Sequence, residues 1–383
     1  MATRTGGESN PLTPAHFSPI VQVFTSFSHG WAICDVDSLP PPCYPGCMIK
    51  YLGSKRLLIP TILGKIQAKQ GVDHVLDLFS GTSRVGHALK SAGYQVTAND
   101  HNAYAETIAR CYIQTDKDAV WEEAKHILEH LSNLQGRPGY FTETFCVKSR
   151  FFQPFNGERI DAIRSAIAEM TLSPELESVL LVSLMEAADR VDSTTGVQMA
   201  YLKQWAQRSY KPLELRMPEL VTRSSKGPGL ALSLDAEEAA KTPCDLAYLD
   251  PPYNQHKYLG NYHIWETLVR WDAPEVYGVA CKRVDCRERG SEFNSKPKFE
   301  AAFSRLISNV AAKRMLVSFN DEGFLNRDDL VRVLSPRGEV TVTEIDYKRY
   351  VGAQIGIHNP EGQKVGTVSH TRNTEYLFDV DGR

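Results

Sequence analysis

The sequence has no excess of either charge and no long hydrophobic run. Its 383 residues carry 43 Lys and Arg against 46 Asp and Glu, a formal net charge of -3. A nucleic-acid partner would therefore have to be held by local basic patches rather than by overall charge. No apolar stretch approaches the ~20 residues that a membrane-spanning helix needs, so the sequence predicts no membrane segment.

The eight cysteines form no recognisable metal-binding or disulfide pattern. The nearest pairs, Cys43 with Cys47 and Cys281 with Cys286, have neither the C-x-x-C spacing nor a cluster of histidines beside them. No signal-peptide pattern accompanies them, so we expect reduced thiols, a cytoplasmic location and no metal site.

The order of strand and helix signals divides the chain into four parts. Residues 1–47, rich in Pro, Ser and Thr, predict a flexible extension. Residues 48–112 open a βαβ unit with "HVLDLF", a glycine-containing turn and "YQVTAND". Residues 113–227 carry helical spacing, above all over 161–170 and 174–191. Strand signals resume in residues 228–383, with "DLAYLD", "RMLVSFND", "EVTVTEIDY" and "TEYLFDV". The sequence thus predicts an α/β fold with a doubly wound, mostly parallel sheet, split by a mainly helical insertion.

The turn in "DLFSGTSRVG" suits a ligand under the first strand. A strand, a tight turn and a helix start present free backbone N–H groups. Asp100 ends the next strand, at the spacing at which an acid binds ribose hydroxyls. The pattern is not G-x-G-x-x-G, because Ser83 stands where a second glycine is expected. NAD, FAD and S-adenosylmethionine all remain possible from this segment, as does a plain βα turn.

The stretch "LDPPYNQHKY" places an acid and a rigid elbow at the end of a buried strand. Pro252 keeps Pro251 extended, so the Asp250 carboxylate and the Pro251 carbonyl form a pair of acceptors. Tyr253 adds a ring that can stack on a base, worth about 1 to 3 kcal/mol. The pattern fits the amino edge of adenine, although D-P-P alone is common in turns.

These motifs together resemble the DNA adenine-N6 methyltransferases, in the group similar to DNA adenine methylase. The order "KYLGSK", "DLFSGT", insertion and "DPPY" carries the resemblance, which covers about residues 48–380. It implies a Rossmann-like catalytic domain in two parts, a target-recognition role for the insertion, and S-adenosylmethionine as cofactor. The implied catalytic residues are Asp250, Pro251, Pro252 and Tyr253. The implied cofactor-binding residues are Lys50, Tyr51, Lys55, Asp77, Phe79, Ser80, Gly81, Asp100 and Asp235. Lys55 is expected near the methionine carboxylate or the catalytic centre, and Asp235 near the cofactor adenine or at a helix cap.

The function expected from the resemblance is site-specific methylation of N6 of a flipped-out adenine in duplex DNA. A monomer is expected, in a restriction-modification or orphan methylation system, with any cognate restriction endonuclease acting separately. Two basic runs are candidates for phosphate contacts. Their members are Lys203, Arg208, Lys211, Arg216, Arg223 and Lys226, and Lys282, Arg283, Arg287, Arg289, Lys296 and Lys298, with Lys257 in the loop after the DPPY motif.

Three rival interpretations remain open on the sequence. An RNA adenine-N6 methyltransferase would use the same pocket. A non-enzymatic DNA-binding protein could retain the fold, although the intact DPPY argues against it. A nicotinamide dehydrogenase could use the first site but leaves the second without a role.

Overall fold

The computed structural model describes residues 48–348, 357–358, 364–366 and 372–382. The predicted extension over residues 1–47 lies outside the described residues. Among the described residues, no helix is long and apolar enough to cross a membrane.

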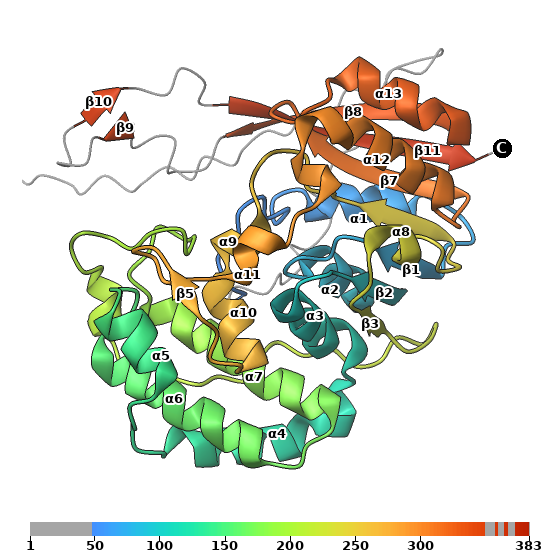
Figure 1. Ribbon diagram of the computed structural model, residues 1–383. Coiled ribbons are helices and arrows are strands. Elements are labelled where there is room, and N and C mark those ends of the chain that lie inside the picture. The colour runs from blue at the N-terminus through green and yellow to red at the C-terminus, as the bar shows by residue number, and fades with distance from the viewer. Residues whose placement is uncertain (1–47, 349–356, 359–363, 367–371, 383) are drawn as a thin grey trace, which may run out of the picture.

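A seven-stranded sheet forms the centre of the described part of the chain (Figure 1). Its order is β3-β2-β1-β4-β7-β11-β8, and neighbours from β3 to β7 are parallel, while β11 is antiparallel to β7 and β8. The strands span Leu230–Leu232 (β3), Gln95–Asn99 (β2), His74–Asp77 (β1), Leu246–Leu249 (β4), Arg314–Asn320 (β7), Arg372–Gly382 (β11) and Gly338–Lys348 (β8). The predicted doubly wound, mostly parallel sheet is confirmed. The chain reverses its direction of winding between β1 and β4, where open α/β sheets bind ligands.

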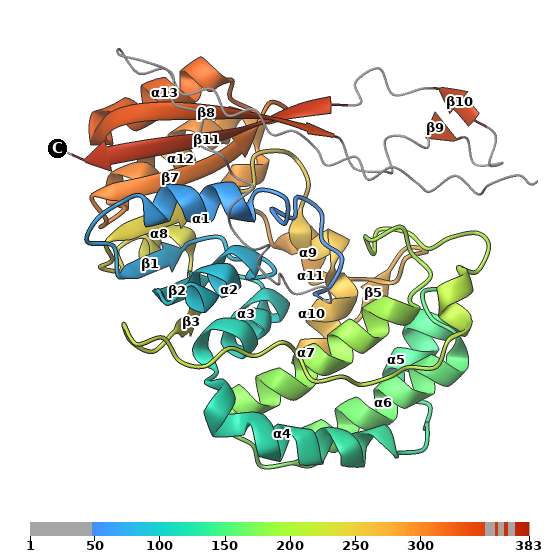
Figure 2. The ribbon, with the colours of Figure 1, turned by 180° about the vertical axis from the view of Figure 1, so that it is seen from behind.

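Side chains alternate between two cores, one on each face of the sheet. In β4, Leu246 and Tyr248 belong to one core, and Ala247 and Leu249 to the other, as the period of two in a strand requires. One face is covered by α1 (Ile59–Gln67), α2 (Arg84–Ser91) and α3 (Ala103–Ala109), which lie in front of the sheet in Figure 2. The other face is covered by α8 (Ala236–Ala239), α12 (Lys296–Asn309) and α13 (Arg327–Leu334).

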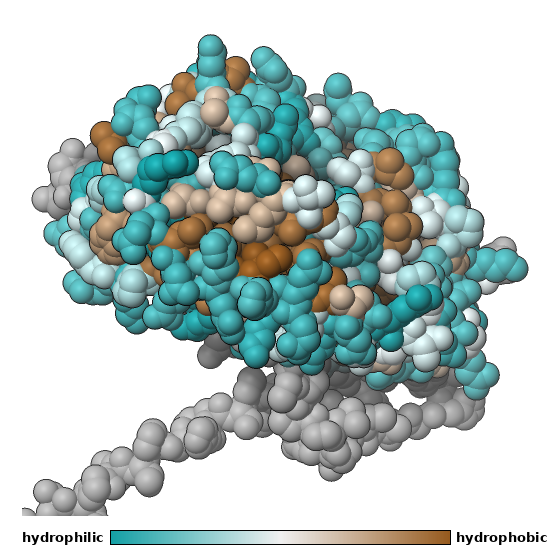
Figure 3. Space-filling view, turned by 90° about the horizontal axis from the view of Figure 1, so that it is seen from below, coloured by the Kyte–Doolittle hydropathy of each residue, from teal (hydrophilic) through white to brown (hydrophobic). Residues whose placement is uncertain are grey.

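The insertion is mainly helical and forms the lower part of the molecule in Figure 1. Its helices are α4 (Lys117–Ser132), α5 (Tyr140–Thr142), α6 (Pro154–Glu169) and α7 (Pro174–Val191), with π-helical turns η2 (Arg110–Gln114) and η3 (Glu143–Val147) and a 3₁₀ turn η4 (Gln207–Tyr210). The start of α7 follows from local chemistry, because the Ser173 side chain accepts from the N–H of Leu176 and Pro174 takes the first helical turn. Seen from below, this part shows a band of apolar residues among hydrophilic ones (Figure 3).

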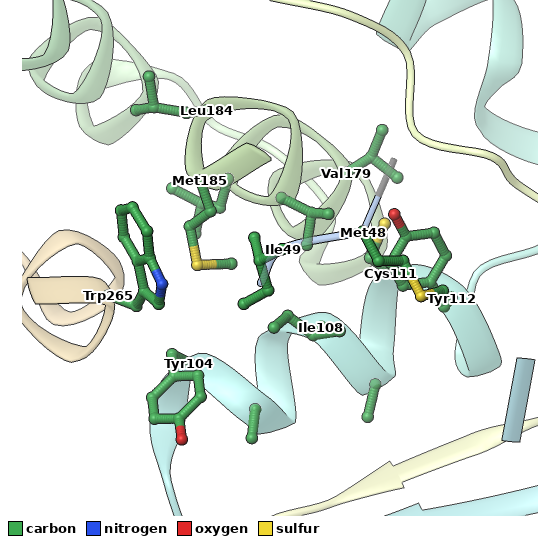
Figure 4. Close-up of a cluster of buried hydrophobic side chains, with 14 of the residues drawn as sticks. Met48, Ile49, Tyr104, Ile108, Cys111, Tyr112, Val179, Leu184, Met185 and Trp265 are labelled. Atoms are coloured by element: carbon green, nitrogen blue, oxygen red, sulfur yellow. The ribbon is translucent and has the colours of Figure 1, made fainter. Parts of the chain in front are cut away.

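A segment from the second part of the sequence also packs on the helical part. It contains α9 (Tyr258–Asn261), α10 (His263–Arg270), the hairpin of β5 (Val276–Tyr277) and β6 (Lys282–Arg283), and α11 (Asp285–Glu288). Arg164 of α6 donates to the carbonyls of Leu268 and Val269. Figure 4 shows α3, α7 and α10 sharing one buried cluster, with Trp265 beside Met185. The helical part is therefore joined to the sheet by a continuous core rather than by a linker.

The 3₁₀ turns η5 (Glu292–Asn294) and η6 (Ser335–Arg337) precede α12 and β8, and β9 (Ile357–His358) pairs with β10 (Lys364–Gly366).

Candidate active site

A cavity of about 310 Å³ lies at the carboxyl ends of the parallel strands. Asp77 ends β1, Asp100 follows β2 and Asp250 follows β4, and all three line the cavity. Parallel strands bring their last residues to one edge of a sheet, so residues far apart in sequence meet there.

The turn after β1 has the backbone that a close ligand approach requires. Gly81 has a φ of 50°, and a Cβ at that position would lie 3.2 Å from the Tyr51 ring. Ser83, where a second glycine was expected, takes a left-handed φ of 55°. The position therefore does demand the backbone geometry that glycine adopts most easily, and serine adopts it here.

Asp100 holds this turn in place. Its Oδ2 accepts from the N–H of Gly81 at 3.1 Å, and its Oδ1 accepts from the N–H of Asn102 at 2.9 Å. Burial raises the pKa of Asp100 above its ordinary value, and these backbone bonds oppose the rise. The acid at the end of β2 thus lies directly beside the turn after β1, and it lines the cavity.

Asp77 is buried beneath the start of α2. Asp77 is only 1% exposed, and its Oδ2 accepts a hydrogen bond from the N–H of Gly86 at 3.1 Å. Burial, and next the charge of Asp250, raise the pKa of Asp77 to about 7. A buried acid with one backbone partner at a cavity wall suits a cationic ligand group.

Asp250 is the acid of the DPPY elbow, and it is ion-paired with Lys55. The Lys55 Nζ lies 3.3 Å from Asp250 Oδ1 and 3.1 Å from Glu375 Oε2, and Lys55 is 5% exposed. Burial raises the pKa of Asp250 to about 6 against the opposing effect of Lys55. For Lys55, burial opposes the ammonium, but Asp250, Tyr253 and Glu375 more than offset it and raise its pKa well above the ordinary value.

The rest of the DPPY elbow is partly covered by protein. Pro252 lines the cavity, whereas Pro251 and Tyr253 are buried beside it. Tyr253 is 8% exposed, its hydroxyl accepts from Asn320 Nδ2 at 2.9 Å, and its ring lies against Phe319. The ring that the sequence assigned to base stacking is therefore packed against Phe319 and is not among the residues that line the cavity in this structure.

Tyr51 lies in an aromatic stack that the sequence did not reveal. Its ring is stacked on Tyr258 with centroids 5.3 Å apart and on Tyr262 at 4.5 Å. The Tyr51 hydroxyl is 3.2 Å from that of Tyr104. No spacing rule pairs Tyr258 or Tyr262 with Tyr51, because the stack depends on how distant segments of the chain pack together.

The remaining predicted cofactor residues fall in different places. Phe79 and Ser80 line the cavity. Asp235 lines it as well, and its side chain also accepts from the N–H of Glu237 as the cap of α8. Lys50 is not among the lining residues: its Nζ contacts Asp189 and Asp192 instead.

The predicted phosphate contacts are a mixed set. Lys203, Lys211, Arg216, Lys257 and Arg287 are exposed, as are Arg223, Lys226, Lys296 and Lys298. Arg216 pairs with Glu214, Arg208 with Asp192, and Arg289 with Glu266. Lys282 is half-buried in β6, and the Arg287 guanidinium lies 3.7 Å from the Tyr277 ring centroid.

Arg283 does not lie at the surface as the sequence suggested. It is 2% exposed, and its guanidinium donates to both Asp272 oxygens at 2.7 Å and to Asp285. A bidentate pair of this kind fixes the β5–β6 hairpin, and leaves the side chain no access to phosphate in this structure.

Several buried polar atoms around the cavity lack a protein partner. Among the described residues, Ser80 Oγ, Arg84 Nε and Asn102 Oδ1 are buried without a hydrogen bond, and all three residues line the cavity. Buried polar groups are normally satisfied, so these atoms fit a polar ligand such as the amino-acid and ribose parts of an adenosine cofactor. No cluster of metal-ligating side chains occurs in the described part of the chain.

The fold and the site together define a Rossmann-like methyltransferase. The chain belongs to the family of D12 class N6 adenine-specific DNA methyltransferases, whose model matches residues 51–327.

Curated relatives agree with the family. The chain is 30% identical to Modification methylase StsI of Streptococcus sanguinis over 327 residues, which cover 80% of this chain and 50% of that protein. It is 30% identical to the type II methyltransferase M.NlaIII of Neisseria lactamica over 315 residues, covering 79% of this chain and 92% of that protein. M.FokI of Planomicrobium okeanokoites is 29% identical, with 79% and 50% covered. The chain thus spans about half the length of two of these relatives and nearly all of the third.

Proposed function

We propose that this protein transfers a methyl group from S-adenosylmethionine to N6 of an adenine flipped out of duplex DNA. The observation that carries the proposal is the place of Asp250. Its carboxylate lines the same cavity as the turn after β1, and the buried Lys55 holds it there. A carboxylate in this place, beside the turn that would hold the cofactor, can accept a proton from the N6 amino group of adenine.

The residues of the cavity fit the cofactor. Asp77 supplies a negative charge for the amino group of the methionine part, and Asp100 supplies acceptors for the ribose hydroxyls. The unpartnered atoms of Ser80 and Arg84 supply further polar contacts. Lys55 is committed to two carboxylates, so the proposal assigns it to the catalytic centre rather than to the methionine carboxylate. Lys50 has no part in cofactor binding here, because its ammonium pairs with Asp189 and Asp192.

The chemistry rests on alignment. When bound, the cofactor supplies a methyl group activated by its sulfonium charge. Asp250 and the Pro251 carbonyl accept hydrogen bonds from the N6 amino group and orient its lone pair toward that methyl group. Tyr253, packed beneath the Lys55 ammonium with the Nζ 5.7 Å from its ring centroid, supports this acceptor pair. Positioning and preorganised electrostatics supply the acceleration.

The helical part is proposed to recognise the target. An adenine in a duplex reaches the pocket only after flipping, at a cost of a few kcal/mol. The exposed basic residues Lys203, Lys211, Arg216, Lys257 and Arg287 are proposed to contact phosphates, and the half-buried Arg208, Lys282 and Arg289 are further candidates. Arg283 is left out because it is buried. We propose that the protein acts as a monomer. We also propose that it modifies specific sites, with any restriction endonuclease acting separately, because a relative is named a modification methylase.

The test is methylation of duplex DNA by the wild type and by Asp250→Ala. The substitution should reduce the rate by at least about a hundredfold, the scale for one preorganised catalytic hydrogen bond, and leave S-adenosylmethionine binding unchanged by calorimetry. Asp245→Asn is the matched control, because Asp245 precedes the same strand at its exposed end. Near-wild-type turnover of Asp250→Ala would refute the mechanism, and transfer to structured RNA but not to duplex DNA would refute the substrate.

A further inference from the structure

The Lys55 ammonium lies between two carboxylates, and only one of them belongs to the DPPY elbow. Asp250 Oδ1 is 3.3 Å from Nζ, and Glu375 Oε2 is 3.1 Å from it. The Lys55 and Glu375 side chains are 5% and 10% exposed, so neither group is in bulk solvent. Burying a second carboxylate at this site costs free energy unless that carboxylate is well paired or has a function.

Glu375 reaches the site through the direction of its strand. β11 runs antiparallel to β7, and Glu375 is paired with Asn320, the last residue of β7. On its other side Glu375 is paired with Ile345 of β8. An antiparallel strand places its first residues at the edge where its parallel neighbours place their last ones. Glu375 therefore meets Asp250 at the carboxyl edge, although 125 positions separate them in the sequence.

We propose that Glu375 is a positioning residue for the methyl transfer. It holds the Lys55 ammonium between the two carboxylates and thereby keeps Asp250 a strong proton acceptor. The inference rests on the proposed function. Glu375 does not touch the substrate in this account, and it acts through the Lys55 ammonium alone.

The physical reason is a division of charge. A cation that has one carboxylate partner withdraws charge from that partner and makes it a weaker base. Lys55 divides its donors between two carboxylates, so Asp250 receives part of this effect only. The negative charge of Glu375 also opposes ionisation of Asp250, and so raises the pKa of Asp250, while Lys55 lowers it.

The other groups that face Asp250 do not replace this effect. They are Asp77 from β1, Tyr248 from β4, Tyr253 from the elbow and Tyr258 from α9. Burial raises the pKa of each of the three tyrosines well above 10, so they remain neutral. The Lys55 ammonium is ion-paired with Asp250 and Glu375, whereas the charges of Asp77 and Asp250 act on each other directly rather than through Lys55. Glu375 is therefore the acid that shares the cation with Asp250.

The basicity of Asp250 matters because a proton leaves N6 during the reaction. The N6 lone pair forms the new bond to the methyl carbon, the carbon–sulfur bond breaks and its electron pair stays on sulfur. One N6 proton then passes to the Asp250 carboxylate, and Lys55 remains protonated. General-base efficiency rises with the pKa of the base as long as the base is ionised at the working pH.

The test is Glu375→Gln, with two readouts. The turnover number at pH 8 should fall about two- to threefold, and the acid limb of its pH profile should move to lower pH by about half a unit, because Asp250 becomes a weaker base. The Kd for S-adenosylmethionine should stay unchanged. Glu375→Asp should be intermediate, and Glu344→Gln, an exposed position on β8, is the control that should match the wild type.

The second readout does not need turnover. Carboxyl-carbon NMR titration of ¹³C-labelled aspartate, with the Asp250→Asn spectrum to identify the resonance, gives the Asp250 pKa in the free protein. Glu375→Gln should lower it. A slower variant with an unmoved acid limb and an unmoved Asp250 pKa would show a structural role and overturn the inference. Wild-type protein that binds S-adenosylmethionine but methylates no DNA would overturn the proposed function instead, while the titration would still decide the role of Glu375.

Discussion

Replacing Asp77 tests how much its buried carboxylate lowers the stability of the protein. Its carboxylate is buried beneath α2 with the N–H of Gly86 as its hydrogen-bond donor. Burial and the charge of Asp250 raise its pKa from 3.8 to about 7. Asp77→Asn keeps an oxygen for the Gly86 N–H and removes the charge. The variant should be more stable than the wild type at pH 8 and should bind S-adenosylmethionine more weakly.

The sign of the stability change follows from proton linkage. Below pH 3.8 the acid is protonated in the folded and unfolded chains, so it contributes nothing. Between 3.8 and about 7 the folded chain retains a proton that the unfolded chain has lost, so stability falls as the pH rises. At about 1.4 kcal/mol per unit of pKa, the penalty above pH 7 is at most about 4 kcal/mol. The buried amide has its own cost, so the expected gain of the variant at pH 8 is about 1 to 3 kcal/mol.

The assay is urea unfolding of the cofactor-free protein from pH 4 to pH 8, beside calorimetric binding of S-adenosylmethionine. The stability of the variant relative to the wild type should rise with pH, from about 1 to 3 kcal/mol below the wild type near pH 4, where only the cost of the buried amide remains, to above it at pH 8. Asp245→Asn is the control of opposite sign, because backbone bonds from His74 and Asp73 outweigh burial and lower the pKa of Asp245. A variant that is less stable than the wild type at pH 8, or that binds the cofactor equally well, would refute this account of Asp77.

Two further predictions concern other buried groups. Burial lowers the pKa of His263 to about 3, and its Nδ1 has no hydrogen-bond partner among the described residues. The unfolded chain therefore binds a proton that the folded chain does not, and the free energy of unfolding of the wild type should fall by about 1.4 kcal/mol per pH unit below pH 6.5. In the same urea titration, His263→Gln should lose less. Ser83 has a φ of 55° and a buried, unpartnered Oγ. Ser83→Gly should therefore raise stability by about 1 kcal/mol, measured as a higher urea midpoint with an unchanged m-value. Ser83→Ala keeps the backbone strain, and a gain from alanine as large as that from glycine would contradict the explanation.

The sheet and the long helices were predictable because their signals are local. α7 begins and ends at the residues that its apolar spacing and its Ser-Pro start indicate, 174 and 191. β4 and β7 follow short apolar runs that stop at polar residues. Periodicity and capping act within a few residues, so one sequence contains the information. The three cavity acids were predictable for the related reason that the carboxyl ends of parallel strands share an edge.

Contacts between distant segments were not predictable from such signals. The residues of the β5–β6 hairpin were assigned to the second part of the catalytic domain, residues 228–383, and Lys282 and Arg283 were expected to be candidates for phosphate contacts. In the structure this segment packs on the helical part, where Arg283 forms an ion pair with Asp272. Nothing in the spacing of a basic run distinguishes a solvated arginine from one that a neighbouring aspartate will bury, because the difference depends on which elements pack together.

Glu375 shows the same limit at the site itself. The "TEYLFDV" strand was predicted correctly, but the first acid of a strand has no local mark of function. Its role depends on the antiparallel direction of β11 and on the register that sets Glu375 beside Asn320. A shift of one residue would turn Glu375 to the opposite face of the sheet, away from Lys55. The second carboxylate at Lys55 is therefore a property of the sheet order, and it became visible only when β11 was placed between β7 and β8.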